Sequence, residues 1–460
     1  MHKINVIILA AGKGTRMFSA KPKVLHEIAG RSLLQHTLDT AAAINASTTH
    51  IVIGHEAELI RQALTGKPVE IVLQEQQLGT AHAVHQALEQ LDKTAIALVL
   101  YADVPLIKTE TLQRLLQCVD KNSMAVLTCV VTNPLGLGRI LRDNDQNICA
   151  IIEDKETTAE QKQIKEINTG VMAIPVARLY DWLPRISANN SQSEYYLTDL
   201  VSLALADSCK VSTVQCKDEF EASGVNNRVQ LAELERHYQK NEATRLMLAG
   251  VTLRDPMRVD FRGHANISAD VDIDINVILE GDITIARNVY IGPNCLLKNC
   301  VIGEGTIIAA NSVIEDAVIG KKCNIGPFAR IRPGTALEDE VKVGNFVEIK
   351  NSTIGKHSKV NHLSYVGDST LGDYVNVGAG TITCNYDGVN KFKTVIGDNV
   401  FIGSNTALVA PVTIAAGATI GAGSVITKNV DKDQLAVARG RQANMNGWQR
   451  PQKIIKSHKE

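Results

Sequence analysis

The chain has 460 residues, enough for two or more domains, and 45% of them are hydrophobic although only 4% are aromatic. A formal net charge of −1 argues against a nucleic-acid or membrane surface held by bulk charge, and no stretch reaches the roughly 18–20 apolar residues of a membrane span. The nine cysteines are scattered without a CxxC pair and the N-terminal apolar run is too short for a signal peptide, which together indicate a cytoplasmic protein.

Residues 1–226 alternate between two kinds of segment. Strands are predicted at the apolar runs Val6–Ala10, His50–Ile53, Val69–Leu73, Ala95–Tyr101 and Ala125–Val131, and helices at Leu33–Ile44, Thr80–Leu91 and Glu110–Val119. This alternation is typical of an α/β domain with a mostly parallel sheet. Such sheets bind ligands at the carboxyl ends of their strands, so the residues that follow each strand are the first candidates for a site.

A glycine-containing loop, Ala10–Met17, follows the first strand directly. Small residues let backbone N–H groups approach phosphate oxygens without Cβ clashes. Arg16 and Lys23 supply positive charge, and Pro22 can fix the direction of the lysine side chain. Glycine pairs alone usually mean a tight turn, but a strand, a glycine loop, an arginine and Pro-Lys in this order favour a phosphate site.

Asp103 comes at the end of another apolar strand, where a bare carboxylate is costly unless it is paired or bound to a metal. Carboxylates at strand ends are also common as caps or turn formers, so this position alone decides little. His82 and His85 have the spacing of metal ligands, but no third ligand is in view and ordinary helix-face histidines are the simpler interpretation.

One long helix is predicted over Asn227–Ala249, closed by Gly250, and it would join the two parts of the chain. From about Val251 to Val437 aliphatic residues recur in hexads, irregularly at first (Ile273, Ile278, Ile283 and Ile291). A period of six residues cannot be one face of an α-helix of 3.6 residues per turn. The clearest runs are Ile319, Ile325, Ile331, Leu337, Val343 and Ile349, and then Ile396, Ile402, Leu408, Ile414, Ile420 and Ile426. This period predicts a hexapeptide parallel β-helix with the aliphatic residues inside.

Small or β-branched residues follow four places after these aliphatic residues, at Cys323, Ala329, Thr335, Val341, Val347, Thr353, Val400, Thr406, Val412, Ala418 and Ser424. Cys384–Thr394 breaks the hexad and is predicted to project as a loop. The tail after Arg439 is polar, with basic residues at Arg450, Lys453, Lys456 and Lys459, which is typical of a mobile or partner-bound end.

The repeat region also contains polar residues with no role in hexad packing: Arg332, Glu348, Lys350, His362, Tyr365, Asn376, Asn385 and Tyr386. Arg332 and Lys350 are one coil apart, so they are predicted to stack as a basic pair suited to a sugar phosphate. A solvated face could also supply such a pair. A single histidine in a repeat is usually a surface residue, although acyl transfer to an amine needs a base of this kind.

The run Leu9–Met17 followed by Pro22 and Lys23 resembles the signature of sugar-1-phosphate nucleotidyltransferases. The whole chain is similar to the bacterial bifunctional enzymes that are both glucosamine-1-phosphate N-acetyltransferase and N-acetylglucosamine-1-phosphate uridylyltransferase. Besides the first motif, the resemblance includes Gln74, Gly79–Thr80, Tyr101–Pro105, Gly136–Ile140, Glu166–Gly170, Gly224–Arg228 and Cys384–Gly388.

The resemblance implies a Rossmann-like α/β nucleotidyltransferase domain (1–226), a linker helix (227–250) and an all-β, left-handed parallel β-helix acetyltransferase domain with a C-terminal tail (251–460). The second domain would acetylate glucosamine-1-phosphate from acetyl-CoA by direct transfer. The first would then transfer UMP from UTP to N-acetylglucosamine-1-phosphate with Mg²⁺, releasing pyrophosphate. The product, UDP-N-acetylglucosamine, would feed peptidoglycan and lipopolysaccharide synthesis. A homotrimer with acetylation sites shared between chains is implied as well.

The resemblance also assigns residues to the first site. UTP would be bound by Leu9, Ala10, Ala11, Gly12, Gly14, Arg16, Lys23, Gln74, Gly79, Thr80, Tyr101, Ala102 and Asp103, with Arg16 and Lys23 catalytic. N-acetylglucosamine-1-phosphate would be bound by Gly138, Glu153, Asn168 and Asn226, and Mg²⁺ by Asp103 and Asn226. Ala81 and Ala102 stand where glycine is common in the family, so each adds a methyl group near the expected nucleotide.

In the second site His362 would be the base and Glu348 would orient or polarise it. Glucosamine-1-phosphate would be bound by Arg332, Lys350, Tyr365 and Asn376, and acetyl-CoA by Ala379, Asn385, Tyr386, Ser404, Ala422 and Arg439. Because coenzyme A already supplies an activated thioester, a covalent role for Cys384 is disfavoured.

Two alternatives remain at this point. One is a sugar-1-phosphate nucleotidyltransferase of single activity with a structural or regulatory β-helix, which would lack the polar set on the repeats. The other is a non-catalytic scaffold, which should have lost Arg16, Lys23 or Asp103.

Overall fold

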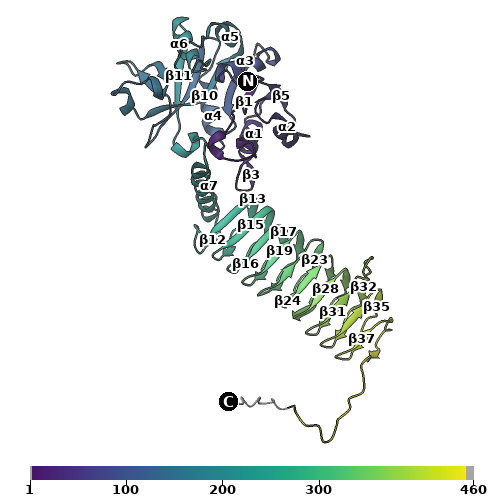
Figure 1. Cartoon of the computed structure of the whole chain (residues 1–460). Coiled ribbons are helices and arrows are strands. Elements are labelled where there is room, and N and C mark those ends of the chain that lie inside the picture. The colour runs from purple at the N-terminus through teal and green to yellow at the C-terminus, as the bar shows by residue number, and fades with distance from the viewer. Residues whose placement is uncertain (1–2, 452–460) are drawn as a thin grey trace, which may run out of the picture. The chain divides into compact units, whose positions relative to one another are not determined.

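The computed structural model describes residues 3–451, so Lys453, Lys456 and Lys459 of the basic tail lie outside the described residues. The chain divides into two compact units (Figure 1). The first runs to Arg245 and takes in Asp260–Gly263, and the second is made by the rest of the chain. The division at residues 226 and 250 stays a prediction.

The first unit is built on a mixed nine-stranded sheet of order β11-β7-β10-β6-β1-β4-β5, with β8 and β9 attached beside β10. Its strands are β1 (Ile4–Leu9), β4 (Thr48–Ile53), β5 (Glu70–Leu73), β6 (Ile96–Tyr101), β7 (Ser123–Val130), β8 (Arg139–Arg142), β9 (Ile148–Ile152), β10 (Glu166–Pro175) and β11 (Lys210–Gln215), and a separate hairpin pairs β2 (Glu27–Ile28) with β3 (Arg31–Ser32). Strand β10 is antiparallel to β6 and β7, whereas β6, β1, β4 and β5 are parallel.

Helices cover both faces of this sheet, as the alternation of segments predicted. They are α1 (Leu33–Ala43), α2 (Ala57–Ala63), α3 (Thr80–Ala87), α4 (Thr109–Gln117), α5 (Val176–Trp182) and α6 (Asp199–Ala206), with 3₁₀ turns at Thr15–Met17, Lys23–Leu25, Leu88–Gln90, Asp154–Glu156, Gln161–Gln163, Leu183–Arg185 and Glu219–Ala222. Residues of α1, α2 and α4 share one core cluster, and residues of α3, α5 and α6 share the other. Strand β1 contributes Val6 and Ile8 to the first cluster and Ile7 to the second, so it is buried on both faces.

Helix α7 (Arg228–Leu248) agrees with the long helix that was predicted. The side chain of Gln239 accepts a hydrogen bond from the Phe261 N–H and donates one to the Phe261 carbonyl, both at 2.8 Å. This pairing ties the returning segment Asp260–Gly263 to the helix within the first unit. Among residues 3–451, no helix is long and apolar enough to cross a membrane.

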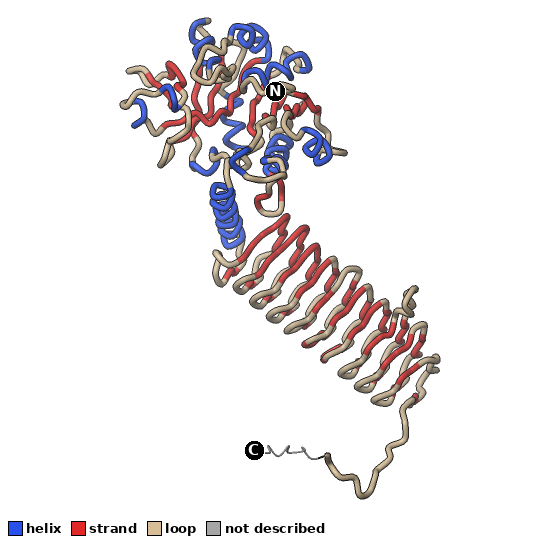
Figure 2. The backbone as a smooth tube through the Cα atoms, viewed as in Figure 1, coloured by secondary structure: helices blue, strands red, loops and turns tan. Residues whose placement is uncertain are grey.

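The second unit is a parallel β-helix whose short strands stack as rungs on three walls (Figure 2). The first wall contains β12 (Thr252–Leu253), β14 (Asp272–Ile273), β16 (Tyr290–Ile291), β18 (Ile307–Ile308), β21 (Asn324–Ile325), β24 (Lys342–Asn345), β27 (Lys359–His362), β30 (Asn376–Val377), β33 (Phe401–Ile402), β36 (Thr419–Ile420) and β38 (Leu435–Ala436). The second contains β20 (Ala317–Ile319), β23 (Thr335–Leu337), β26 (Thr353–Ile354), β29 (Ser369–Leu371), β32 (Thr394–Ile396) and β35 (Val412–Ile414). The third contains β19 (Val313–Glu315), β22 (Arg330–Ile331), β25 (Glu348–Lys350), β28 (Tyr365–Gly367), β31 (Ile382–Cys384), β34 (Ala407–Val409) and β37 (Val425–Ile426). The longer strands β13 (Val259–Ile267), β15 (Val277–Ile285) and β17 (Leu296–Ile302) begin the second and third walls.

The predicted inward positions are confirmed: every aliphatic residue of the two hexad runs is at most 4% exposed. The small residues that follow are buried too, with one exception. Thr353 is exposed and Ser352 is buried in its place, because the coil after Ile349 is one residue shorter than the hexad expects. The pairing of Ile349 with Val366 shows the same slip.

The alternation along β20 gives a test of the interior. Ile319 is 1% exposed and its neighbour Val318 is 55% exposed on the same strand. We expect Ile319→Ala to lower the free energy of unfolding by about 2–5 kcal/mol, because it leaves a cavity between coils. Val318→Ala should change it by less than about 0.5 kcal/mol. Urea unfolding followed by circular dichroism measures both, and equal losses would contradict the assigned inside and outside.

Candidate functional sites

The glycine loop leaves the sheet at the carboxyl end of β1, between β4 and β6. Gly14 has φ of +59°, and a Cβ atom there would lie 2.8 Å from the Cβ of Lys23. A side chain at Gly14 would therefore be strained and would push Lys23 away, so glycine lets the loop close against the lysine.

Four predicted residues from distant parts of the chain converge beside this loop. The Lys23 ammonium donates a hydrogen bond to the Asp103 carboxylate and lies 3.3 Å from the side-chain oxygen of Asn226. The Arg16 guanidinium donates to the same oxygen at 3.0 Å. The side chains of Lys23 and Asp103 are only 12% and 19% exposed, so this ion pair is largely shielded from water.

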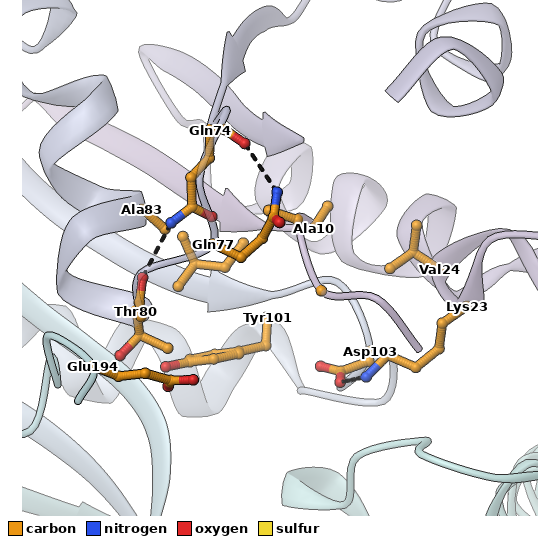
Figure 3. A pocket seen from close by; sticks show the side chains of 14 residues that line it. Ala10, Lys23, Val24, Gln74, Gln77, Thr80, Ala83, Tyr101, Asp103 and Glu194 are labelled. Atoms are coloured by element: carbon orange, nitrogen blue, oxygen red, sulfur yellow. Dashed lines mark hydrogen bonds and ion pairs between the residues drawn. The ribbon is translucent and has the colours of Figure 1, made fainter. Parts of the chain in front are cut away.

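Two pockets of the first unit meet at Asp103. The first, shown in Figure 3, is lined by Leu9, Ala10, Ala11, Gly12, Lys23, Val24, Gln74, Gln77, Gly79, Thr80, Ala83, Tyr101, Asp103 and Glu194. The second contains Arg16, Asp103, Asn168 and Asn226 together with residues of the 131–137 and 219–234 segments. A group held in one pocket can therefore reach a group held in the other beside the cluster of Arg16, Lys23, Asp103 and Asn226.

Most of the residues predicted for the nucleotide line the first pocket, and Arg16 lies in the second. Ala81 and Ala102 are 2% and 0% exposed, and their side chains belong to the two core clusters. The alanine methyl groups at these two positions, where glycine is common in the family, are thus packed into the core. Gln77, Val24, Ala83 and Glu194 are lining residues that the sequence did not single out.

Of the residues predicted for the sugar, Asn168 lies on β10, and the others lie before β8 (Gly138), after β9 (Glu153) and before α7 (Asn226). The Asn168 N–H donates to the Gly138 carbonyl at 2.8 Å, and a Cβ at Gly138 would lie 3.5 Å from a carboxylate oxygen of Glu153. Burial raises the pKa of Glu153, and nearby Glu156 adds to the effect. Burial likewise raises the pKa of Tyr101, whose ring lines the first pocket.

The oxygens of Asp103 and Asn226 fit a divalent cation. Both converge on one point, which the Lys23 ammonium approaches. Mg²⁺ in nucleotide sites is commonly held by one or two carboxylates, with phosphate and water oxygens completing the octahedron. Within residues 3–451, no cluster of three His, Cys, Asp or Glu side chains is arranged to hold a metal, so a two-oxygen site that needs a phosphate partner fits better than a closed cage.

A second group of polar residues lies on the third wall of the β-helix. The Arg332 guanidinium donates to the Glu348 carboxylate at 2.6 Å. The pairing of Ile331 with Ile349 brings Arg332 beside Lys350. Interaction with Lys391 lowers the pKa of Lys350, and the charge of Arg332 adds to this effect. Three cations gathered with two carboxylates, Glu348 and Asp368, leave an excess of one positive charge, which suits a phosphate.

Tyr365 lies one coil further along the same wall, paired with Glu348. Its hydroxyl accepts a hydrogen bond from the side-chain amide of Asn385 at 3.5 Å, and the Asp368 carboxylate holds that amide from the other side. A Cβ at Gly367 would lie 2.3 Å from the Tyr365 hydroxyl oxygen, so this glycine leaves room for the tyrosine.

His362 ends β27 at an edge of the first wall, where it pairs with Asn345 on the preceding coil. Its Nδ1 lies 3.2 Å from the side-chain oxygen of Asn345. An amide oxygen only accepts, so Nδ1 is the donor in this contact, and the neutral ring with this tautomer has its lone pair on Nε2. That Glu348 orients His362 stays a prediction, since the recorded partners are Asn345 for the histidine and Arg332 for Glu348.

The residues predicted for acetyl-CoA follow His362 along the same edge. Backbone hydrogen bonds join Gly380 to His362, Asn405 to Ala379 and Gly423 to Ser404, so these turns stack on successive coils. The Arg439 side chain continues the column by donating to the Ala422 carbonyl at 2.7 Å. Asn385 and Tyr386 belong to the hexad-breaking loop, in which Tyr386 pairs with Lys391.

Asn376 is the exception among the residues predicted for glucosamine-1-phosphate. It lies on β30 of the first wall, whereas Arg332, Lys350 and Tyr365 follow the third.

Sequence reasoning missed Lys391 and Asn345. The only sequence signal for Lys391 was its position in the loop that interrupts the hexads, and for Asn345 its distance of one coil from His362.

Comparison with known proteins matches each part. The family model described as MobA-like NTP transferase domain matches residues 6–155, GMPPB C-terminal domain matches 261–347, and Bacterial transferase hexapeptide (six repeats) matches 393–428. A protein of Pseudomonas entomophila is 54% identical over 99% of this chain and 100% of its own length, and one of Marinobacter nauticus is 53% identical over 98% and 100%. Both are named bifunctional protein GlmU. A nucleotidyl transferase from Methanothermobacter is similar over 52% of this chain and 99% of its own, with 19% identity and a TM-score of 0.38.

Fold and sites together define a nucleotidyltransferase joined to a hexapeptide-repeat transferase. The family models match separate parts of the chain, whereas the relatives are more than 50% identical over nearly the full length of both proteins. The chain belongs to the GlmU family of bifunctional proteins.

The raised pKa of Glu153 predicts a pH-dependent effect on stability. The folded protein holds the Glu153 proton more tightly than the unfolded chain, so its contribution is fully present below the ordinary pKa of 4.5 and is lost as pH rises through the raised value. We expect Glu153→Gln to unfold at a higher temperature than the unchanged protein at pH 7, with the difference shrinking toward pH 4. Thermal unfolding across this pH range measures it.

Glu160 is exposed whereas Glu153 is half-buried, so Glu160→Gln provides the control by removing the same charge from open solvent. An equal rise in unfolding temperature at pH 7 in both variants would mean that the change in net charge is responsible, and not the burial of Glu153.

Proposed function

We propose that each unit catalyses one of two successive reactions of this bifunctional uridylyltransferase and acetyltransferase. The second unit acetylates glucosamine-1-phosphate from acetyl-CoA. The first unit then joins the product, N-acetylglucosamine-1-phosphate, to UMP from UTP and releases pyrophosphate. The observation that carries the first assignment is the convergence of Arg16, Lys23, Asp103 and Asn226 where two pockets meet.

In the first reaction a sugar phosphate oxygen attacks the α-phosphorus of UTP in line with the leaving pyrophosphate. The barrier is mostly one of positioning and charge. The nucleotide occupies the pocket of Figure 3, with its phosphates against the backbone N–H groups of the loop from Ala10 to Gly14. Arg16 and Lys23 hold the phosphate oxygens, and both offset the charge that grows as pyrophosphate departs.

Asp103 and Asn226 would hold Mg²⁺, which supplies further charge neutralisation at the phosphates when bound. Lys23 shares these oxygens in the structure, and it becomes free to contact a phosphate once they bind another cation. Asn168 binds the N-acetyl sugar in the second pocket. Gly138, whose carbonyl accepts from the Asn168 N–H, and Glu153 beside it complete the sugar site.

In the second reaction the cations Arg332, Lys350 and Lys391 bind the phosphate of glucosamine-1-phosphate, and Tyr365 and Asn376 bind the sugar. Nε2 of His362 accepts a proton from the amine as the amine attacks the acetyl thioester. Asn345 fixes the tautomer that leaves this nitrogen free. Coenzyme A lies along the column of Ala379, Ser404, Ala422 and Arg439, with Asn385 and Tyr386 beside it.

The active form is a homotrimer in the cytoplasm. Phe328, Phe346 and Leu363 are 49%, 56% and 64% exposed at one corner of three successive coils, and the two phenylalanine rings stack with centroids 5.4 Å apart. An apolar ladder of this kind is a surface for other copies of the chain. Asn376 would then meet the third-wall residues of a neighbour. Nine free cysteines are consistent with a reducing compartment.

The two activities should separate by substitution. We expect His362→Ala to abolish the release of free thiol from acetyl-CoA that depends on glucosamine-1-phosphate, because no base remains for the amine. Pyrophosphate release from UTP and N-acetylglucosamine-1-phosphate should stay within about twofold, since the first unit is unchanged. Loss of both activities in a folded variant would overturn the two-site assignment.

Asp103→Ala is the reciprocal variant. It should abolish pyrophosphate release at ordinary Mg²⁺ concentrations and leave the sugar-dependent thiol release intact. Retained uridylyl transfer would remove Asp103 from the metal site.

Lys391 gives a test of the phosphate cluster. We expect Lys391→Met to raise the KM for glucosamine-1-phosphate by roughly tenfold or more, because a charge-assisted contact to phosphate is lost. The KM for acetyl-CoA should change little. Lys393→Met is the matched control, since Lys393 is an exposed lysine of the same loop. Equal effects of the two substitutions would mean that Lys391 acts only through the general charge of the loop.

A further inference from the structure

The side-chain amide of Gln74 is held in one orientation by two neighbours. Gln74 follows β5 and is 3% exposed. Its nitrogen Nε2 lies 3.2 Å from the Gly79 carbonyl oxygen and 2.9 Å from Nδ1 of His82 (the first contact is a dashed line in Figure 3). A carbonyl oxygen only accepts hydrogen bonds, so the atom that faces it must be the amide nitrogen and cannot be the oxygen.

The same geometry fixes the tautomer of His82. The second hydrogen of the Gln74 nitrogen points at Nδ1, which must therefore offer a lone pair. The ring proton of the neutral histidine then belongs on Nε2, which lies 3.2 Å from the side-chain nitrogen of Gln86. The Gln86 amide must turn over to present its oxygen to that proton, and it then gives up the 3.4 Å contact of its nitrogen with the His82 carbonyl.

With both hydrogens of Gln74 engaged, the amide oxygen is the atom left for a ligand. Among the described residues the structure records no hydrogen bond to this oxygen, and Gln74 lines the first pocket. An oxygen can only accept, so it selects a ligand that donates. The uracil ring carries a donor at N3, whereas cytosine carries an acceptor at the same position.

We propose that His82 is a positioning residue for base selection: by accepting from the Gln74 nitrogen it holds the amide oxygen toward the pocket, where that oxygen accepts from the N3–H of a uracil base. This rests on the proposed binding of UTP in the same pocket. His82 itself does not line the pocket, so it acts only through Gln74.

Burial of His82 supports this arrangement. Burial lowers the pKa of the imidazole, and the nearby His85 on the same helix lowers it further. The neutral form, which alone has the lone pair on Nδ1, is thereby favoured. From the other elements the groups near the ring are the Tyr195 ring, with centroids 6.4 Å apart, and the Gln76 backbone. Protonation would place a donor against the Gln74 nitrogen and release the amide.

The test compares three variants of the full-length protein with UTP and CTP as alternative substrates. His82→Leu removes the acceptor. His82→Asn keeps an acceptor oxygen near the position of Nδ1. His85→Leu makes the same change as the first variant on an exposed face of the same helix. Pyrophosphate release gives kcat and KM for each nucleotide, and sugar-dependent thiol release reports on the second unit.

We expect His82→Leu to raise the KM for UTP and to lower the preference for UTP over CTP in kcat/KM, each by roughly tenfold or more. His82→Asn should recover most of the preference, and His85→Leu should leave it unchanged. An unchanged preference in His82→Leu, or a loss that His82→Asn does not recover although both variants show normal thiol release, overturns the proposal. If the unchanged protein itself releases no pyrophosphate from UTP, the proposed function fails instead.

Discussion

The first site depends on the contacts of one cation, the Lys23 ammonium, with the side chains of Asp103 and Asn226. Lys23 follows the glycine loop, Asp103 ends β6, and Asn226 precedes α7, so three segments remote in sequence meet at one ammonium. They can meet because β1 and β6 are parallel neighbours whose carboxyl ends share one edge of the sheet. The side chains of Lys23 and Asp103 are largely shielded from water, so a carboxylate at this place needs a cation beside it.

The interior of the β-helix was predictable residue by residue, whereas its exact phase was not. Whether a residue points inward depends on the local period, and the aliphatic positions Ile319 to Ile349 all proved buried. That Ser352 is buried in place of Thr353 depends instead on the number of residues in one turn, and a single sequence does not show that number. Because each coil restarts from its own turn, the slip shifts the period after it without disturbing the core.

The predicted site residues differ in the same way. Arg16, Lys23, Asp103 and Asn226 came from motifs, and the parallel sheet explains why they converge. Lys391 and Asn345 reach Lys350 and His362 only because different coils stack on one another, which no motif marks. The sequence also could not predict that Glu348 pairs with Arg332 and not with His362, because this depends on the wall from which each side chain projects.

A physical difference between the two sites follows from their supports. The first is assembled by loops at one edge of one sheet, so a single chain can complete it. The second lies on a prism whose walls face in different directions, and a convex surface cannot by itself surround a substrate. If Asn376 on the first wall and Tyr365 on the third bind one sugar, as proposed, a second surface must close the site between them. The exposed ladder of Phe328, Phe346 and Leu363 lies at the corner where such a surface would pack. Under the proposed trimer, assembly would therefore be a condition for acetyl transfer but not for uridylyl transfer.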